Sequence, residues 1–374
     1  MHNRSFTRAT LASVTLFGGV VCVTFALFLA SCSSLQPAHR ATPLGDVGDC
    51  PPRYSIVCLI HGDGSYLYHD SQGRALRADE QILAEAKTVA EQNPQAEVLI
   101  FHQTRKRHLL LFFPRRDGTF YYYRSGRLFA QESYWRDRSP SRLDPEVELY
   151  HRYSIAERSH AIRFFLYFGH EIPEFGGADY DASYPDRTFT INDLANCLHS
   201  MNSDSTKFDL AVLATCYNGT PRTIFTIAPY ARYIIASPEN LHLSYFDLQP
   251  FKRLDIGLQD GDLSSFAKEF AHQAFDRLTE EVQTAVTVAV YDVDRLREYL
   301  QSVQSVYDSA LTALQGEPPA SLEHCDCAED SAYALPGMNA GLEIFYRPPL
   351  FGRLKHKPSH SGWECWRRVP RTSD

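Results

Sequence analysis

Several features that define common protein classes are absent from this chain. Its 374 residues hold 37 Lys and Arg against 45 Asp and Glu, a formal charge of −8, so the basic excess typical of nucleic-acid-binding proteins is missing. No second Cys or His pair stands at zinc-finger spacing, and we find no internal repeat. His170-Glu171 does not begin a zinc-protease motif, because Glu174 occupies the position of the second His. These absences argue against nucleic-acid binding, a zinc site and a repeat fold.

The N-terminus has the pattern of a bacterial lipoprotein signal. Arg4 and Arg8 precede an apolar run from Ala9 to Ala30, which stops at Leu29-Ala30-Ser31-Cys32. That tetrapeptide matches the lipobox, in which the cysteine is acylated and the bond before it is cut. The run is long enough to span a bilayer, so an ordinary signal peptide and a membrane helix are the alternatives. We expect lipidation of Cys32, which anchors the protein to a membrane of the cell envelope, outside the cytoplasm.

The chain divides into four parts by composition. Residues 1–31 are the signal peptide, and residues 32–52, rich in Ser, Pro, Gly and Ala, form a tether. Residues 53–348 are expected to form one large domain, and residues 349–374 a C-terminal tail. Removal of the signal leaves 35 Lys and Arg against 45 Asp and Glu, a charge of about −10. Short basic clusters such as Lys355-His356-Lys357 indicate solvated surface, with contact to anionic lipid or substrate as the alternative.

The nine cysteines can be assigned in part from the sequence. Cys22 leaves with the signal, Cys32 takes the lipid, and Cys216 is needed free for the chemistry argued below. An even remainder permits up to three disulfides outside the cytoplasm. Cys325-Asp326-Cys327 is read as a structural pair, with bridging to Cys365 as one option and a redox or metal role as the alternative. The six remaining cysteines are Cys50, Cys58, Cys197, Cys325, Cys327 and Cys365.

Apolar strands and helices alternate along the chain, which predicts an α/β fold. A mainly parallel sheet with helices on both faces is expected, together with a small antiparallel meander in the aromatic runs between 109 and 131. Residues 155–161 have helical character, and segment 316–339 is expected to be a long loop. The predicted strands are 54–60, 97–102, 162–168, 208–214, 233–237, 285–290 and 342–347, and the main predicted helices are 77–92, 192–201 (capped by Asn192 or Thr190), a helix opening with Pro221, 263–278 and 293–314.

Two side chains capable of nucleophilic catalysis follow two of the buried strands. His170 comes after the strand that ends at Phe168, and Cys216 comes after the strand that ends at Ala214. Parallel strands bring such residues to one edge of a sheet. An imidazole can move the protons of a cysteine nucleophile, and a cysteine that opens a helix has its thiolate favoured by the helix dipole. Each residue alone is more often structural, so their paired placement carries the prediction.

These segments resemble the clostripain family of cysteine peptidases, relatives of caspases and gingipains. The resemblance rests on Phe164 to His170, on Phe208 to Cys216, and on Tyr233-Ile-Ile-Ala-Ser-Pro-Glu239, and it continues through Ala289 to Asp294 and Gly341 to Tyr346. It implies a three-layer caspase-like sandwich and a cysteine endopeptidase with a His170–Cys216 dyad. A monomer acting on peptide or protein substrates is expected, with no required cofactor.

The resemblance also assigns further site residues. Backbone N–H groups of Glu171 and Cys216 are expected to form the oxyanion hole, although Glu171 replaces the family's Gly and its side chain crowds the approach. Ala214 stands where the family usually has an Asp that selects Arg or Lys before the cleaved bond. Other expected substrate-contacting residues are Thr215, Ser237 and Glu239, with Glu239 a candidate acidic wall.

Three other interpretations remain at this stage. Relatives of the family bind calcium, and Asp179, Asp181 and Asp186 leave a calcium site open, although solvated loop acids are the simpler reading. A peptidase-like lipoprotein that only binds its partner is a non-enzymatic alternative. An α/β hydrolase with a Cys nucleophile is less favoured, because that fold places its His after the nucleophile and small residues around it, unlike Ala214 and Asn218.

Overall fold

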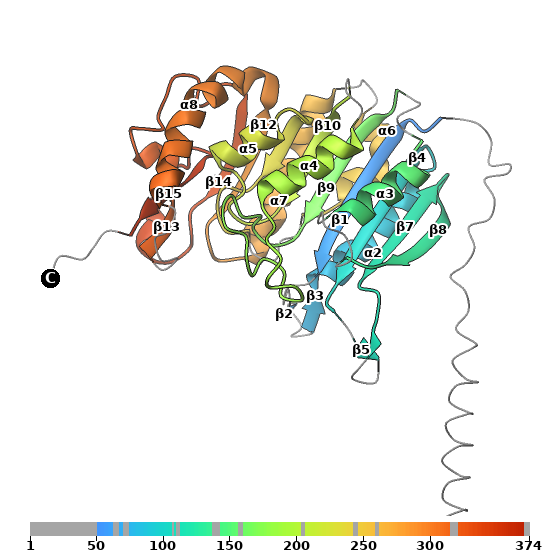
Figure 1. Cartoon of the computed structure of the whole chain (residues 1–374). Coiled ribbons are helices and arrows are strands. Elements are labelled where there is room, and N and C mark those ends of the chain that lie inside the picture. Colours follow the sequence, from blue (N-terminus) through green and yellow to red (C-terminus); the bar gives the residue numbers. More distant parts are fainter. Residues whose placement is uncertain are drawn as a thin grey trace, which may run out of the picture. The chain divides into compact units, whose positions relative to one another are not determined.

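A nine-stranded mixed sheet forms the centre of the computed structural model (Figure 1). Its middle is a run of five parallel strands in the order β11-β10-β9-β1-β4. These are β1 (Tyr54–Gly62), β4 (Ala96–Thr104), β9 (Ile162–Phe168), β10 (Phe208–Ala214) and β11 (Ala231–Ala236). The structure describes residues 51–369 except 63–66, 70–74, 107, 110–112, 137–142, 156–159, 203–205, 242–245, 259–261 and 315–320.

Antiparallel strands extend the sheet at both sides. β12 (Val286–Asp292) and β14 (Leu342–Arg347) follow β11, and β7 (Gly118–Arg124) and β8 (Arg127–Tyr134) follow β4. Of the three aromatic runs expected to form a meander, the second and third are β7 and β8 at this end of the main sheet, whereas the described ends of the first, at 108–109 and 113–114, pair with each other in a separate sheet. The mainly parallel sheet is confirmed.

Helices cover both faces, because the strands are apolar on both sides. On β1, Val57 and Leu59 join the core under one helical layer, whereas Ile56 and Cys58 join the core under the other. Figure 1 shows α3, α4 and α5 lying over the first face. That layer contains α3 (Asp144–Tyr153), α4 (Ile191–Met201), α5 (Pro221–Ile227) and α8 (Val293–Leu314), and the opposite layer contains α2 (Ala78–Gln92), η4 (Gln249–Arg253), α6 (Leu254–Gly257) and α7 (Leu263–Glu281).

Local signals explain several of these boundaries. Thr190 and Asp193 form a capping box at the start of α4, and Thr220 caps α5 ahead of Pro221. The predicted limits of α8 and β14 match the structure. Of the helix expected at 155–161, residues 155, 160 and 161 are not helical and 156–159 lie outside the described residues; the helix α3 ends before it, at Tyr153. No helix in the described part of the chain is long and apolar enough to cross a membrane.

The C-terminal segment is part of the folded domain, which corrects the expected tail at 349–374. β15 (Glu364–Arg368) pairs antiparallel with β13 (Leu322–Asp326), and a disulfide joins Cys327 to Cys365. Trp363 is fully buried and packs on Tyr291 and Tyr299 of the main domain. The segment 316–339 therefore contains a strand as well as loop. Smaller elements are β2 (Leu67–His69), β3 (Ala75–Arg77), β5 (His108–Leu109), β6 (Phe113–Pro114), η6 (Cys327–Glu329) and η7 (Arg353–His356).

The N-terminal expectations concern residues that the structure does not describe. Cys32, the signal at 1–31 and nearly all of the tether lie outside the described residues, as do Cys22 and Cys50. The described residues all belong to one compact unit that begins at Ala41.

Candidate active site

Two adjacent parallel strands carry the predicted catalytic residues. Phe168 at the end of β9 is paired with Ala214 at the end of β10, and the Gly169 N–H donates to the Ala214 carbonyl at 3.4 Å. His170 and Cys216 each lie two residues beyond this pair. Both therefore leave the sheet at the same edge, on neighbouring strands.

A buried asparagine links the two turns that follow these strands. Asn218 Oδ1 accepts the N–H of Ile172 at 2.9 Å, and Asn218 Nδ2 donates to the Ile172 carbonyl at 2.9 Å. The Thr215 hydroxyl also donates to Asn218 Oδ1, at 2.6 Å. Ile172 lies two residues after His170 and Asn218 two residues after Cys216, so this link fixes the two turns against each other. Sequence reasoning missed it, although Asn is a common turn residue.

The turn after Cys216 is shaped by its backbone. Tyr217 has a φ of 51°, a left-handed conformation that is uncommon outside Gly. Its N–H donates to the Glu239 carbonyl at 3.1 Å, and the Gly219 N–H donates to the Ser237 carbonyl at 3.0 Å. A Cβ at Gly219 would lie 2.7 Å from Pro238 N, so only Gly fits there.

This geometry corrects one expectation from the sequence. α5 begins at Pro221, five residues after Cys216, and it has only seven residues. Cys216 therefore does not open the helix, and the helix dipole does not explain its reactivity.

Cys216 is the accessible thiol among the described residues. Its side chain is partly exposed, and Sγ lies 3.5 Å from Asn240 Oδ1 and 3.6 Å from the Leu241 carbonyl. Cys58, Cys197 and Cys325 are also free but buried. Burial raises the pKa of both Cys58 and Cys325 to about 12, which keeps these thiols protonated and unreactive.

The His170 imidazole is neutral at physiological pH. Part of the side chain reaches solvent, but neighbouring protein atoms still desolvate the ring. This desolvation, and secondly repulsion from His61, lowers the pKa of His170 to about 4. A neutral ring at physiological pH is able to accept a proton and to return it.

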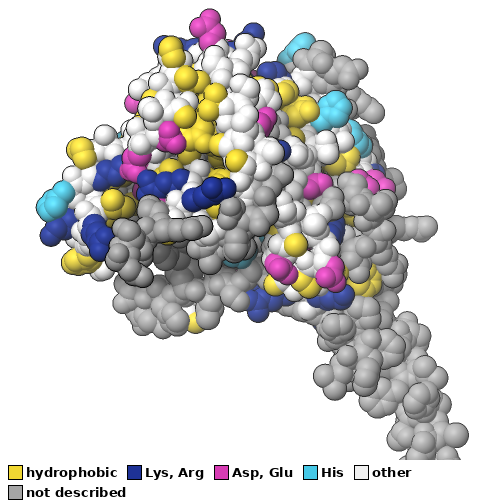
Figure 2. Space-filling view, turned by 60° about the vertical axis from the view of Figure 1, so that its left-hand side comes forward, with side chains coloured by type: hydrophobic (Ala, Val, Ile, Leu, Met, Phe, Trp, Pro, Cys, Tyr) yellow, Lys and Arg dark blue, Asp and Glu magenta, His cyan; other side chains and the backbone are white. Residues whose placement is uncertain are grey.

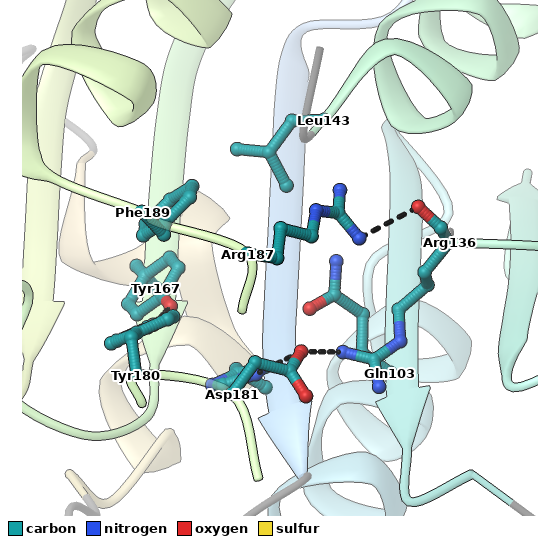
Figure 3. Close-up of a pocket in the computed structure, with 9 residues that line it drawn as sticks. Gln103, Arg136, Leu143, Tyr167, Tyr180, Asp181, Arg187 and Phe189 are labelled. Atoms are coloured by element: carbon teal, nitrogen blue, oxygen red, sulfur yellow. Dashed lines mark hydrogen bonds and ion pairs between the residues drawn. The ribbon is translucent and has the colours of Figure 1, made fainter. Parts of the chain in front are cut away.

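His61, which sequence reasoning did not select, belongs to a buried polar network beside the site. The ring stacks on Tyr180, with centroids 4.8 Å apart, and Nε2 lies 3.3 Å from Asp181 Oδ2. Arg136 donates to the same oxygen at 2.6 Å and to Asp117 at 3.2 Å. Figure 3 shows Asp181 and Arg136 facing each other in a small pocket of about 340 Å³, including its open mouth.

The same network bears on the calcium interpretation. Asp181 Oδ2 is occupied by Arg136, and Oδ1 accepts the N–H of Ser183 at 3.0 Å. Among the residues that the structure describes, no three His, Cys, Asp or Glu side chains are grouped to hold a metal ion.

The four residues expected to contact substrate differ in their burial and in their hydrogen-bond partners. Ala214, Thr215 and Ser237 are buried, with the Ser237 hydroxyl donating to the Glu239 carbonyl at 2.8 Å. The Glu239 carboxylate accepts a hydrogen bond from Thr287, and burial raises its pKa. The side chains of Ala214, Thr215 and Ser237 therefore lie inside the fold, not on the solvent side of the turns.

The C-terminal strand pair forms a wall beside Cys216 that the sequence did not reveal. The His324 ring stacks on the Tyr217 ring, with centroids 3.9 Å apart. The ring centroids of His324 and Trp366 are 3.7 Å apart. His324 Nε2 also lies 3.5 Å from Glu171 Oε1. The N–H of Glu364 donates to the Gly219 carbonyl at 3.0 Å, which attaches β15 directly to the turn after Cys216. Glu171 is thus directed toward this wall.

Comparisons with known proteins agree with this architecture. Residues 175–336 match the model of the clostripain family; this range contains Cys216 and starts five residues after His170. No curated protein sequence matches significantly. An inactive zymogen C11 protease from Parabacteroides distasonis superposes with a TM-score of 0.56 at 15% identity, covering 87% of this chain and 94% of its own.

Two further solved structures come from Bacteroides thetaiotaomicron. A secreted C11 cysteine protease has a TM-score of 0.53 at 14% identity, covering 84% of this chain and 93% of its own. A C11 cysteine protease in complex with an irreversible peptide inhibitor has a TM-score of 0.50 at 13% identity, covering 69% and 71%. At these identities the likeness establishes the fold alone. Within residues 175–336 the sequence thus matches the clostripain family of cysteine peptidases, and the described fold is similar to that of C11 proteases.

Proposed function

We propose that the protein is an endopeptidase in which Cys216 is the nucleophile and His170 carries the protons. The Cys216 thiol gives its proton to the neutral His170 ring and its sulfur attacks the scissile carbonyl. The protonated ring then donates that proton to the leaving amine, and an acyl enzyme remains. Water, giving a proton to His170, attacks the thioester and releases the carboxylic acid, after which the proton returns to the sulfur. No cofactor enters these steps.

The observation that carries the proposal is the link between Asn218 and Ile172. Two hydrogen bonds of 2.9 Å join the residue two positions after Cys216 to the residue two positions after His170. Together with the Phe168–Ala214 register, this link supports a close and fixed approach of the imidazole to the thiol.

Backbone N–H groups of Cys216 and of the 170–171 turn are proposed to hold the oxyanion. The side chain of Glu171 was expected to crowd this approach. Its carboxylate instead lies 3.5 Å from His324 Nε2, on the side of the C-terminal wall. A side chain held there leaves its backbone available for the role that Gly has in the family.

Anchoring to the cell envelope through a lipid on Cys32 is also proposed. The Cys327–Cys365 disulfide supports a location outside the reducing cytoplasm. Metabolic labelling with a fatty-acid analogue tests the anchor. The label should be lost in Cys32→Ser and retained in Cys22→Ser; incorporation that survives Cys32→Ser would contradict it.

The peptidase proposal is tested by labelling the folded chain with a peptide that carries a thiol-reactive group. Mass spectrometry should find the adduct on Cys216, with no adduct and no peptide hydrolysis in Cys216→Ala. Cys325→Ala is the matched control, because that thiol is free but buried. His170→Gln should fold and lose hydrolysis by a factor of about 100 or more. Unreactive Cys216 in a folded protein would instead favour the binding lipoprotein, and hydrolysis that survives Cys216→Ala would refute the proposed nucleophile.

A further inference from the structure

A short segment after the last strand of the sheet exposes large apolar side chains. The residues 350–356 are all exposed, and among them Leu350, Phe351 and Leu354 have relative exposures of 53%, 69% and 57%. These three are half of the six large apolar side chains that are strongly exposed in the described part of the chain. Such a local concentration on a water-soluble surface indicates a binding surface.

The same segment carries only positive charge. Arg353 and Lys355 lie between and beside the exposed apolar residues, with His356 following them, and the sequence from 348 to 357 contains no Asp or Glu. This is unusual in a chain with a formal charge of −8. Figure 2, in which the left-hand side of Figure 1 comes forward, shows hydrophobic side chains exposed among Lys, Arg, Asp and Glu side chains on this face.

The backbone of the segment is held in place at both ends. The Leu350 N–H donates to the Gln283 carbonyl at 2.9 Å, and Lys357 Nζ lies 2.9 Å from Asp326 and 3.1 Å from Glu329. Between these attachments, Gly352 adopts a φ of 89° and the one-turn helix η7 follows. The apolar side chains are therefore presented outward by a fixed turn.

We propose that residues 350–356 form a docking surface for an anionic lipid bilayer. Leu350, Phe351 and Leu354 would enter the interface between headgroups and acyl chains, while Arg353 and Lys355 contact lipid phosphates. A protruding turn with apolar tips and a basic rim complements a negatively charged, fluid surface. An acidic protein pocket is the alternative occupant, and the experiment below separates it from lipid.

The position of the segment relates this surface to catalysis, a point that rests on the proposed function. Arg347 at the end of β14 is paired with Val286, and Ala289 three residues later pairs with Ala236 at the end of β11. β14 thus ends at the same edge of the sheet as β10, three strands away, or about 15 Å. Docking through 350–356 would bring the edge of the sheet that carries Cys216 toward polypeptides at the bilayer surface.

The test uses the folded unit from Ala41 onward, which lacks the apolar N-terminal run and Cys32. Sedimentation with vesicles of phosphatidylglycerol and phosphatidylcholine should show binding that weakens as salt is added, and little binding to phosphatidylcholine alone. The pair Phe351→Ser with Leu354→Ser, and separately the pair Arg353→Glu with Lys355→Glu, should each weaken binding about tenfold or more.

Matched variants at other exposed places guard against a general surface effect. Ile256→Ser replaces an apolar residue that is 61% exposed on α6, and Arg127→Glu reverses an exposed charge on β8; both should bind like the parent chain. Hydrolysis of a soluble peptide should be unchanged in every variant, which separates docking from catalysis. Absence of binding to the anionic vesicles, or binding that the Phe351 and Leu354 pair does not reduce, would overturn the proposal.

Discussion

Asn218 binds both main-chain polar atoms of Ile172 with hydrogen bonds of 2.9 Å. The Asn218 side-chain amide thus forms the pair of hydrogen bonds that the backbone of a neighbouring strand would form with Ile172. Because Asn218 is fully buried, water cannot replace these bonds when the side chain is removed. The Asn218 amide therefore adds to the Phe168–Ala214 register in fixing the His170 turn against the Cys216 turn.

Asn218→Ala is expected to destabilise the fold by about 3 kcal/mol, since three hydrogen bonds are lost and their buried partners are left without them. Peptide hydrolysis should fall further than the loss of folded protein explains, because the two turns are no longer fixed. Urea unfolding and kcat/KM of the folded fraction measure the two effects.

Asn93→Ala provides a matched control. Asn93 is also buried, donates to the Val89 and Phe251 carbonyls at 2.7 Å, and lies at the end of α2. It should cost similar stability and leave kcat/KM unchanged. Equal kcat/KM in the folded Asn93 and Asn218 variants would show that the link does not align the site.

The acid limb of kcat/KM should lie near pH 4, well below the 6.5 of an ordinary imidazole. Desolvation, and then repulsion from His61, lowers the pKa of His170 to about 4, so the ring becomes protonated and inactive as a proton acceptor only below that pH. His61→Gln removes the repulsion and should move the limb upward. A pH–rate profile with a limb at 6.5 in the parent chain would contradict this assignment.

The same depressed pKa affects stability with a defined sign. Between about pH 4 and 6.5 the unfolded chain binds a proton at His170 that the folded chain does not. The contribution is therefore complete above 6.5 and is lost as the pH falls through this window. Urea unfolding of His170→Gln should show a weaker fall in stability over this range than the parent chain.

Features that depend on residues close together in the sequence could be predicted, whereas features that depend on contacts between distant residues could not. Continuous apolar strands gave the parallel sheet, and turn chemistry at Thr190 and Pro221 gave helix starts, because these signals are local. The common edge of His170 and Cys216 followed from strand order. The wall of His324 and Trp366 could not be predicted in this way. His324 contacts Tyr217, which lies more than 100 positions earlier in the sequence, and Trp366 is brought to His324 by a strand pair that a disulfide closes.

The expected tail shows the same limit. Residues 349–374 are rich in Pro, Lys and Arg and have little periodicity, so nothing local indicates a strand. β15 forms because Cys365 is bonded to Cys327 and Trp363 fills the core against Tyr291 and Tyr299. The burial of these side chains, and not the β-strand propensity of the segment, therefore determines that it forms a strand.

Reduction of the Cys327–Cys365 disulfide is expected to cost about 4 kcal/mol, from the chain entropy of a loop with a sequence separation of 38. Peptide hydrolysis should also fall, because the Glu364 N–H holds the Gly219 carbonyl of the turn after Cys216. Thermal unfolding with and without reductant measures the loss. Cys325→Ala should respond to reductant like the parent chain; a variant that no longer responds would place the bridge on Cys325, which faces Cys365 in the strand register.

Glu364 should make the protein less stable as the solution becomes more basic. Burial, and then the nearby carboxylates of Glu239 and Asp326, raises the pKa of Glu364 to about 10 from its ordinary 4.5. His360, which lies 3.4 Å from it, has its pKa lowered to about 4 by burial, so this contact joins two neutral groups at pH 7. The folded chain therefore holds a proton that the unfolded chain has released.

This difference in bound protons makes the free energy of unfolding fall as the pH rises from about 4.5 toward about 10. Glu364→Gln keeps the shape, has no proton to lose, and should remove that slope. Its melting temperature relative to the parent chain should increase between about pH 8 and about pH 9, a range in which His360 stays neutral in both the folded and unfolded chain. Glu343→Gln, at an exposed ion pair with Lys268, should show no such trend. A constant difference between Glu364→Gln and the parent chain across this range would mean that Glu364 is ionised in the folded protein, and that the wall beside Cys216 carries a buried negative charge.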